Sequence, residues 1–294
     1  MAPLGFAQAL SDAASRVETT LDALLPPASE GRVAAAMRYA ALNGGKRLRA
    51  FLVLEGARLF NVPDTHADRA AAAIECVHAY SLVHDDLPAM DDDDLRRGLP
   101  TVHRKWDEAT AVLAGDGLQA EAFSILAHPR TAQDPNVRTR LIQRLAEASG
   151  VRGMVGGQDL DLLAEQSGTK LDVEDITDLQ RKKTGALIIW SAEAGAILGK
   201  SDPDPMIAFA DNIGLAFQIR DDILDVTGDA SQTGKAVGKD ADAGKATFVS
   251  LLGLEQATEL CDGLATSACD ALAPYGASAD RLKALARFIV ERTN

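Results

Sequence analysis

The sequence predicts an all-α protein that forms a single domain over residues 1–294. Long segments are rich in Ala, Leu, Glu, Arg and Lys, the residues that favour helices, and the alternating pattern of a strand is scarce. No shift in composition and no repeat period divides the 294 residues. With 47% hydrophobic and 25% charged residues, the chain has enough apolar surface to form a core without disulfides.

Nine helical segments are expected, and Pro or Gly residues separate most of them, because neither continues a helix well. The expected helices span residues 4–24, 31–60, 67–87, 106–128, 134–149, 173–198, 204–227, 247–273 and 277–292. The interruptions come, in order, at Pro26-Pro27, Asn61 to Asp64, His128-Pro129, Gly168, Gly199 to Pro205 and Gly228 to Gly244. Residues 194–201 match a loosened phosphate-loop pattern, but they close an apolar helix instead of following a strand. Gly199 is therefore expected to end that helix.

The charge balance and the cysteines exclude some classes of function and indicate a cellular location. Asp and Glu number 43 against 30 Lys and Arg, so the net charge of −13 argues against a nucleic-acid or anionic-membrane binder. Cys76, Cys261 and Cys269 form no metal-binding or disulfide pattern, which favours a cytoplasmic location. The first residues do not resemble a signal peptide, and the apolar stretch 186–198 is too short to span a bilayer.

Aspartates are concentrated in two clusters, each of which follows an apolar helical segment. One contains Asp85, Asp86 and residues 91–94, and the other contains Asp221, Asp222 and Asp225. Buried carboxylates are costly unless they are paired or bind a metal, and oxygen ligands suit Mg²⁺. In the second cluster, residues 221 and 225 lie one turn apart on one helix face, as a shared cation would require.

The first cluster has a less regular spacing. An ideal helix places Asp91 about 240° from Asp85 and aligns Asp92 better. Pro88 disfavours helical geometry just before it, so the segment is not expected to be a regular helix. Spacing by itself leaves the metal ligand open between Asp91 and Asp92.

Basic residues are also clustered, despite the negative net charge. The clusters are Lys46-Arg47-Leu48-Arg49, Arg96-Arg97, Arg181-Lys182-Lys183 and the lysines at 235, 239 and 245. Arginine forks and lysine point charges both suit phosphate oxygens. Together with carboxylates for Mg²⁺, these cations indicate a metal-bound diphosphate ligand. His78 lies seven residues before Asp85, on nearly the same helix face and about two turns away.

Five motifs in a fixed order resemble those of the trans-isoprenyl diphosphate synthases, most closely the bacterial farnesyl diphosphate synthases (geranyltranstransferases). They are Gly44-Gly-Lys-Arg-Leu-Arg49, the segment from Glu75 to Asp91, Asp94-Leu-Arg-Arg-Gly98, Lys183-Thr-Gly185 and the segment from Phe217 to Asp225. Two positions depart from the family pattern. Ala50 replaces the usual Pro, and Ala-Thr-Phe-Val at 246–249 replaces Ser-Thr-Tyr-Pro. Neither departure removes a charge.

The resemblance implies a role for each matching residue. Several Mg²⁺ ions per site would be bound by Asp85, Asp86, Asp91, Asp221 and Asp225. Isopentenyl diphosphate would be held by Lys46, Arg49, His78 and Arg97, and the allylic diphosphate by Arg96, Lys183, Lys235 and Lys245. Catalysis would involve Lys183, Thr184, Gln218 and Arg96, with Thr184 and Gln218 beside the reacting carbons. Chain length would depend on Tyr80 and Ser81.

The same resemblance implies an isoprenoid synthase-like helical bundle around a deep central cavity, a homodimer, and a Mg²⁺-dependent prenyltransferase. The reaction would join isopentenyl diphosphate to dimethylallyl or geranyl diphosphate by ionisation, condensation and elimination, with the released diphosphate as proton acceptor. An aromatic residue at Tyr80 with the long Asp85–Asp91 spacing favours farnesyl diphosphate. The alternatives are a geranylgeranyl diphosphate synthase, a terpene cyclase, which needs no isopentenyl diphosphate site, and a non-catalytic partner subunit, which tends to lose an aspartate motif.

Overall fold

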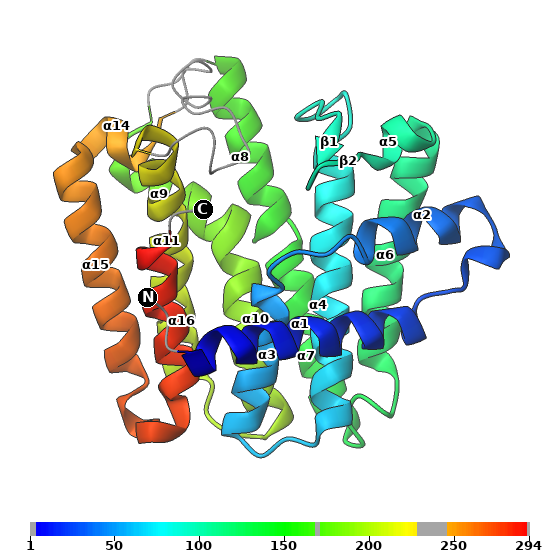
Figure 1. Cartoon of the computed structure of the whole chain (residues 1–294), viewed down its shortest axis with the longest axis horizontal. Helices are drawn as coiled ribbons and strands as arrows, with labels where there is room; N and C mark the ends of the chain where they lie inside the picture. Colours follow the sequence, from blue (N-terminus) through cyan, green and yellow to red (C-terminus); the bar gives the residue numbers. More distant parts are fainter. Residues whose placement is uncertain (1–3, 168–170, 228–245, 293–294) are drawn as a thin grey trace. The chain divides into compact units, whose positions relative to one another are not determined.

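The computed structural model describes residues 4–167, 171–227 and 246–292. Within these ranges the chain is helical throughout, apart from connecting loops and one hairpin of two short strands (Figure 1). The all-α prediction is therefore confirmed. Contacts divide the chain into two compact units: the α4 unit, Gln8–Gln143 with Ala194–Ser201, and the α11 unit, which contains the other described residues.

The α4 unit is built around its central helix, α4. Its elements are α1 (Leu4–Leu24) from residue 8 onward, the 3-10 turn η1 (Ala28–Glu30), α2 (Arg32–Ala41), α3 (Leu48–Leu59), α4 (Asp64–Asp85), β1 (Leu95–Arg96), β2 (Leu99–Pro100), α5 (Val102–Lys105), α6 (Glu108–Ala127) and the first part of α7 (Pro135–Ser149). Helices α3 and α6 pack against α4. Ala70–Ala73 are fully buried, and these small side chains let the neighbouring helices approach closely. This part of the central helix is thus closely packed by its neighbours.

A tight hairpin follows the first aspartate cluster. Leu95 pairs with Pro100 and Arg96 with Leu99 in antiparallel register. The two turn residues, Arg97 and Gly98, have positive φ angles of 55° and 77°. Turns of this kind match the twist of the strands and need two left-handed residues. The turn therefore fixes the direction of both Arg96 and Arg97.

The α11 unit contains the second group of helices. Its elements are the end of α7, α8 (Met154–Ser167), α9 (Val173–Gln180), the π turn η2 (Arg181–Gly185), α10 (Ala186–Leu198) up to residue 193, α11 (Asp204–Thr227), α14 (Phe248–Leu252), α15 (Leu254–Ala271), the 3-10 segment η3 (Ala273–Ala279) and α16 (Asp280–Glu291). Helices α15 and α16 pack on α11, and α8 packs on η2. A Cβ added at Gly157 of α8 would come within 2.1 Å of the Lys183 backbone nitrogen, so glycine is required for this approach.

Several helix boundaries differ from those that the sequence predicts. The expected helix 31–60 is broken after Ala41, because Gly44, Gly45 and Arg47 all have positive φ. The helix expected over 173–198 is interrupted by the π turn, and that over 247–273 by Gly253, whose φ is 81°. Helix α8 was not predicted, because glycines at 150, 153, 156 and 157 lower the helix propensity of this segment.

The predicted helix end at residues 194–201 is confirmed, although the residue with the left-handed conformation is Lys200, with φ of 54°. The Ser201 amide donates to the Ala196 carbonyl at 2.9 Å, which closes the helix. Gly199 serves packing instead, since a Cβ there would lie 2.6 Å from that of Phe60. Among the described helices, none is both long and apolar enough to cross a membrane.

Candidate active site

The first aspartate cluster lies where α4 ends. Asp85 is the last helical residue, and the chain then folds back so that the Asp91 amide donates to the Asp85 carbonyl at 2.8 Å. The next residue, Asp92, has a left-handed φ of 50°, and its amide donates to Leu87 at 3.2 Å. The ideal-helix angles therefore do not apply here. The main chain of Asp91 thus returns to that of Asp85, and Asp91 as the metal ligand stays a prediction.

Asp86 is buried and holds the first hairpin arginine. The Arg96 Nε donates to Asp86 Oδ1 at 3.0 Å, and Arg96 also pairs with Asp93 at 3.2 Å. Burial raises the pKa of Asp86, and the hydrogen bond and charge of Arg96 partly offset this shift. Asp86 thus anchors a cation next to the aspartate cluster.

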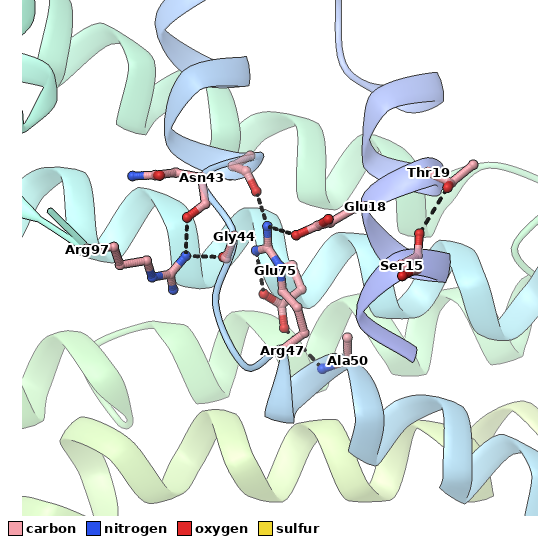
Figure 2. A network of polar contacts seen from close by, with 10 residues as sticks. Ser15, Glu18, Thr19, Asn43, Gly44, Arg47, Ala50, Glu75 and Arg97 are labelled. Carbon is pink, nitrogen blue, oxygen red and sulfur yellow. Dashed lines mark hydrogen bonds and ion pairs between the residues drawn. The ribbon is translucent and has the colours of Figure 1, made fainter. Parts of the chain in front are cut away.

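The second hairpin arginine contacts a different part of the unit. Arg97 donates to the backbone carbonyls of Asn43, at 3.2 Å, and Gly44 (Figure 2). A Cβ at Gly45 would lie 2.6 Å from the Arg97 guanidinium, so glycine leaves space for that group. The two neighbouring arginines therefore extend to two separate places.

A buried ion pair supports the loop between α2 and α3 (Figure 2). Arg47 donates to Glu75 Oε2 at 3.0 Å and to the Ala41 carbonyl at 2.6 Å, which is one of the last carbonyls of α2. The other oxygen of Glu75 accepts from the Ala50 amide, in the first turn of α3, at 3.1 Å. One pair thus ties together the end of α2, the start of α3 and the middle of α4. Sequence motifs place Arg47 among the clustered cations, whereas in the structure it supports the loop through Glu75.

The loop supported in this way carries the cations expected at one diphosphate site. Lys46 is exposed, and Arg49 is the second residue of α3. Burial lowers the pKa of His78 on α4 well below its usual value, and the positive charges of Arg49 and Arg97 lower it further. His78 is therefore neutral at pH 7, within a group of guanidinium groups that would attract an anion.

Tyr80 and Ser81 also lie on α4. Tyr80 is 5% exposed, and its ring meets that of His84 edge to face, with centroids 5.8 Å apart. Burial raises the pKa of its hydroxyl. The Ser81 hydroxyl donates to the His78 carbonyl of its own helix at 3.0 Å. Tyr80 is thus a fixed, bulky group in the interior, about one turn from Asp85.

In the α11 unit, a π turn presents the third basic cluster. The Lys183 ammonium pairs with Asp161 of α8 at 2.5 Å. Thr184 follows in the same turn and is half-buried. π turns of this kind occur frequently at functional sites. Asp161 lies on α8, a helix that the sequence does not predict, so no sequence signal points to this residue.

The second aspartate cluster lies near the end of α11. Asp221 accepts from Arg292 at 2.6 Å, and Asp225 is one turn further along the helix. Gln218 is half-buried one turn before Asp221. Asp222 points elsewhere and accepts from the Phe248 amide at 2.7 Å, which caps the start of α14. Asp222 is therefore structural, and residues 221 and 225 remain as the candidate cation ligands.

The carboxylates fit a cation that is bound together with a phosphate ligand. Within the described residues, no three His, Cys, Asp or Glu side chains gather closely enough to hold a metal. Mg²⁺ in phosphate sites takes one or two carboxylates, with phosphate oxygens and waters completing its coordination. Pairs such as Asp85 with Asp91, and Asp221 with Asp225, supply that donor set. Lys235 and Lys245 lie outside the described residues.

Comparisons with known proteins identify relatives of the whole chain. The polyprenyl synthetase family model matches residues 30–269. Farnesyl diphosphate synthase of Escherichia coli is 49% identical over 267 residues, which cover 87% of this chain and 88% of that protein. The structure of an FPP/GFPP synthase from Zymomonas mobilis superimposes with a TM-score of 0.89 at 48% identity and covers 99% of this chain and 100% of that one. Geranylgeranyl pyrophosphate synthetase from Pyrococcus horikoshii superimposes with a TM-score of 0.88 at 32% identity, covering 98% of each chain.

Proposed function

Because the chain belongs to the polyprenyl synthetase family, we propose that it condenses isopentenyl diphosphate with dimethylallyl or geranyl diphosphate to form farnesyl diphosphate. The observation that best supports this proposal is the divergence of Arg96 and Arg97. Although the two residues are adjacent, the Arg96 guanidinium is anchored beside the aspartates, and the Arg97 guanidinium lies beside the loop that carries Lys46. Two neighbouring anion sites are what a reaction between two diphosphates requires.

The isopentenyl diphosphate site is proposed to consist of Lys46, Arg49, His78 and Arg97. Neutral His78 has an N–H donor for a phosphate oxygen, and the guanidinium groups supply the charge. The buried pair of Glu75 and Arg47 holds the loop between α2 and α3 in place. Pre-positioned cations of this kind bind without a large cost in side-chain ordering.

The allylic diphosphate is proposed to bind at Arg96, Lys183, Lys235 and Lys245. Mg²⁺ is proposed to be held by Asp85, Asp91, Asp221 and Asp225, with Asp86 supporting them through its pair with Arg96. Members of the farnesyl diphosphate synthase family generally use Mg²⁺. When bound, the metal supplies Lewis acidity that stabilises the negative charge of the leaving diphosphate. Lys183, fixed by Asp161, adds a preorganised positive charge at the same group.

Three chain residues and the leaving group account for the rest of the proposed chemistry. The allylic C–O bond ionises, and Thr184 and Gln218 offer oxygen lone pairs to the resulting carbocation without a full negative charge. The double bond of isopentenyl diphosphate attacks the cation, and one proton is then lost to the released diphosphate. Arg96 stabilises that diphosphate after the bond has broken.

Tyr80 is proposed to limit the product to fifteen carbons. Its buried ring lies beyond Asp85 on the helix along which the growing chain would extend. Geranylgeranyl diphosphate synthesis is the second candidate, and the likeness to the Pyrococcus horikoshii enzyme supports keeping it. A longer main product from the unmodified enzyme would favour this second candidate.

Two measurements on the purified chain test the proposal. Chromatography should identify farnesyl diphosphate as the main product, and Tyr80→Ala should shift it toward twenty carbons, while Tyr80→Phe should not. Asp85→Ala should lower turnover by orders of magnitude. Asp64→Ala, at the exposed opposite end of α4, is its matched control. Activity that persists in EDTA, or in Asp85→Ala, would refute the metal-dependent reaction, and an inactive chain would favour the partner-subunit alternative.

Assembly and location are further parts of the proposal. A cytoplasmic homodimer is supported by the exposed apolar side chains of Val112 and Leu113 on α6, and by three cysteines that are all free. The single domain predicted from composition and the central cavity implied by the resemblance both stay predictions. Light scattering of the purified protein would measure the mass of the assembly, and a monomer at micromolar concentration would contradict the dimer.

A further inference from the structure

The last helix of the α11 unit places a buried arginine against the second aspartate cluster. Arg292 directly follows α16, and its NH2 group donates to Asp221 Oδ1 at 2.6 Å. The Arg292 side chain is 7% exposed, whereas that of Asp221 is 45% exposed. The arginine therefore lies behind the carboxylate and faces the protein interior, while the carboxylate reaches solvent.

Contacts with α11 fix both the side chain and the main chain of Arg292. Its guanidinium lies 4.0 Å from the centroid of the Phe217 ring, and the same NH2 group donates to the Phe217 carbonyl at 3.0 Å. In return, Arg220 donates through Nε and NH2 to the Arg292 carbonyl at 3.0 and 2.7 Å. The three partners on α11, Phe217, Arg220 and Asp221, all fall within about one turn.

From these contacts we propose that Arg292 is a positioning residue, which holds the Asp221 carboxylate in the orientation that binds Mg²⁺ with the allylic diphosphate. This inference rests on the function proposed above. A charge-assisted bond to one oxygen restricts the rotation of the carboxylate. Because the guanidinium is buried, it acts through Asp221 and does not itself contact the diphosphate.

The alternative explanation is that Arg292 only stabilises the packing of α16 on α11. The two explanations differ in what they predict for metal binding. A positioning residue changes the Mg²⁺ dependence and the affinity for one diphosphate, whereas a packing residue changes thermal stability alone. A measurement of Mg²⁺-dependent ligand binding therefore distinguishes them, with inorganic pyrophosphate as the probe.

Isothermal titration of the full chain with Mg²⁺ and pyrophosphate should show about tenfold weaker binding for Arg292→Gln, or about 1.4 kcal/mol. The KM for the allylic diphosphate should rise, and that for isopentenyl diphosphate should not. Arg292→Lys keeps the charge and the helix packing, and is expected to recover part of the affinity. Arg287→Gln, which removes an exposed arginine from the same helix, should behave as the unmodified protein.

A double-mutant cycle tests whether the effect runs through Asp221. In an Asp221→Ala background, Arg292→Gln should change pyrophosphate affinity by less than about twofold, because the carboxylate it positions is absent. A full tenfold effect in that background would overturn the inference, as would unchanged affinity of the single variant. Failure of the unmodified chain to bind Mg²⁺-pyrophosphate or to transfer prenyl groups would instead overturn the proposed function.

Discussion

Removal of the Glu75 carboxylate should destabilise the protein far more than removal of the Glu18 carboxylate, although both pair with Arg47. Glu75 and Arg47 have side chains that are each only 2% exposed, and their atoms approach to 3.0 Å (Figure 2). In Glu75→Ala the arginine would remain buried without this counterion, and the Ala50 amide would lose its acceptor. Breaking a buried pair in this way costs about 3–5 kcal/mol.

Glu18→Ala provides the matched control. Glu18 contacts the same arginine at 3.4 Å, but its side chain is 40% exposed, and exposed pairs contribute only about 0–1 kcal/mol. Urea unfolding followed by circular dichroism would measure both variants. At about 2–4 °C per kcal/mol, Glu75→Ala should also lower the melting temperature by roughly 10 °C. A loss below about 1 kcal/mol, or equal losses in both variants, would refute the reasoning.

Three further predictions concern the electrostatics and packing of the site. Because burial and nearby arginines lower the pKa of His78, the unfolded chain binds a proton there that the folded chain excludes. Stability should therefore fall as the pH drops below about 6.5, and urea titrations should show a flatter dependence in His78→Asn. Gly157→Ala should weaken folding and activity, because its Cβ would meet the backbone of Lys183; Gly263→Ala, with open space around it, should be neutral or stabilising by up to about 1 kcal/mol. Asp161→Ala should raise the KM for the allylic diphosphate more than that for isopentenyl diphosphate, whereas equal changes would argue against a specific role for its pair with Lys183.

Helices were predicted best where composition and boundary residues agree. The expected segments 4–24 and 204–227 match α1 and α11 at both ends. Breaks inside a helical pattern were not predicted, because their causes lie elsewhere in the chain. The loop after α2 is held by Glu75, about 30 residues away in the sequence. Glycine in α8 allows that helix to pack closely against the π turn. The helix propensity of the local residues does not depend on either contact and so cannot predict them.

Sequence motifs were sufficient to name the candidate residues, but not to say how each one is held. The sequence by itself determined the helical class, the aspartate and basic clusters and the likeness to prenyl diphosphate synthases, because these depend on residue types and short spacings. Only the tertiary structure decided that Asp222 accepts from the first amide of α14 and that Arg292 lies behind Asp221. The physical reason is that a carboxylate's partner is set by packing between distant segments, and residues 221 and 292 meet only when α16 closes onto α11.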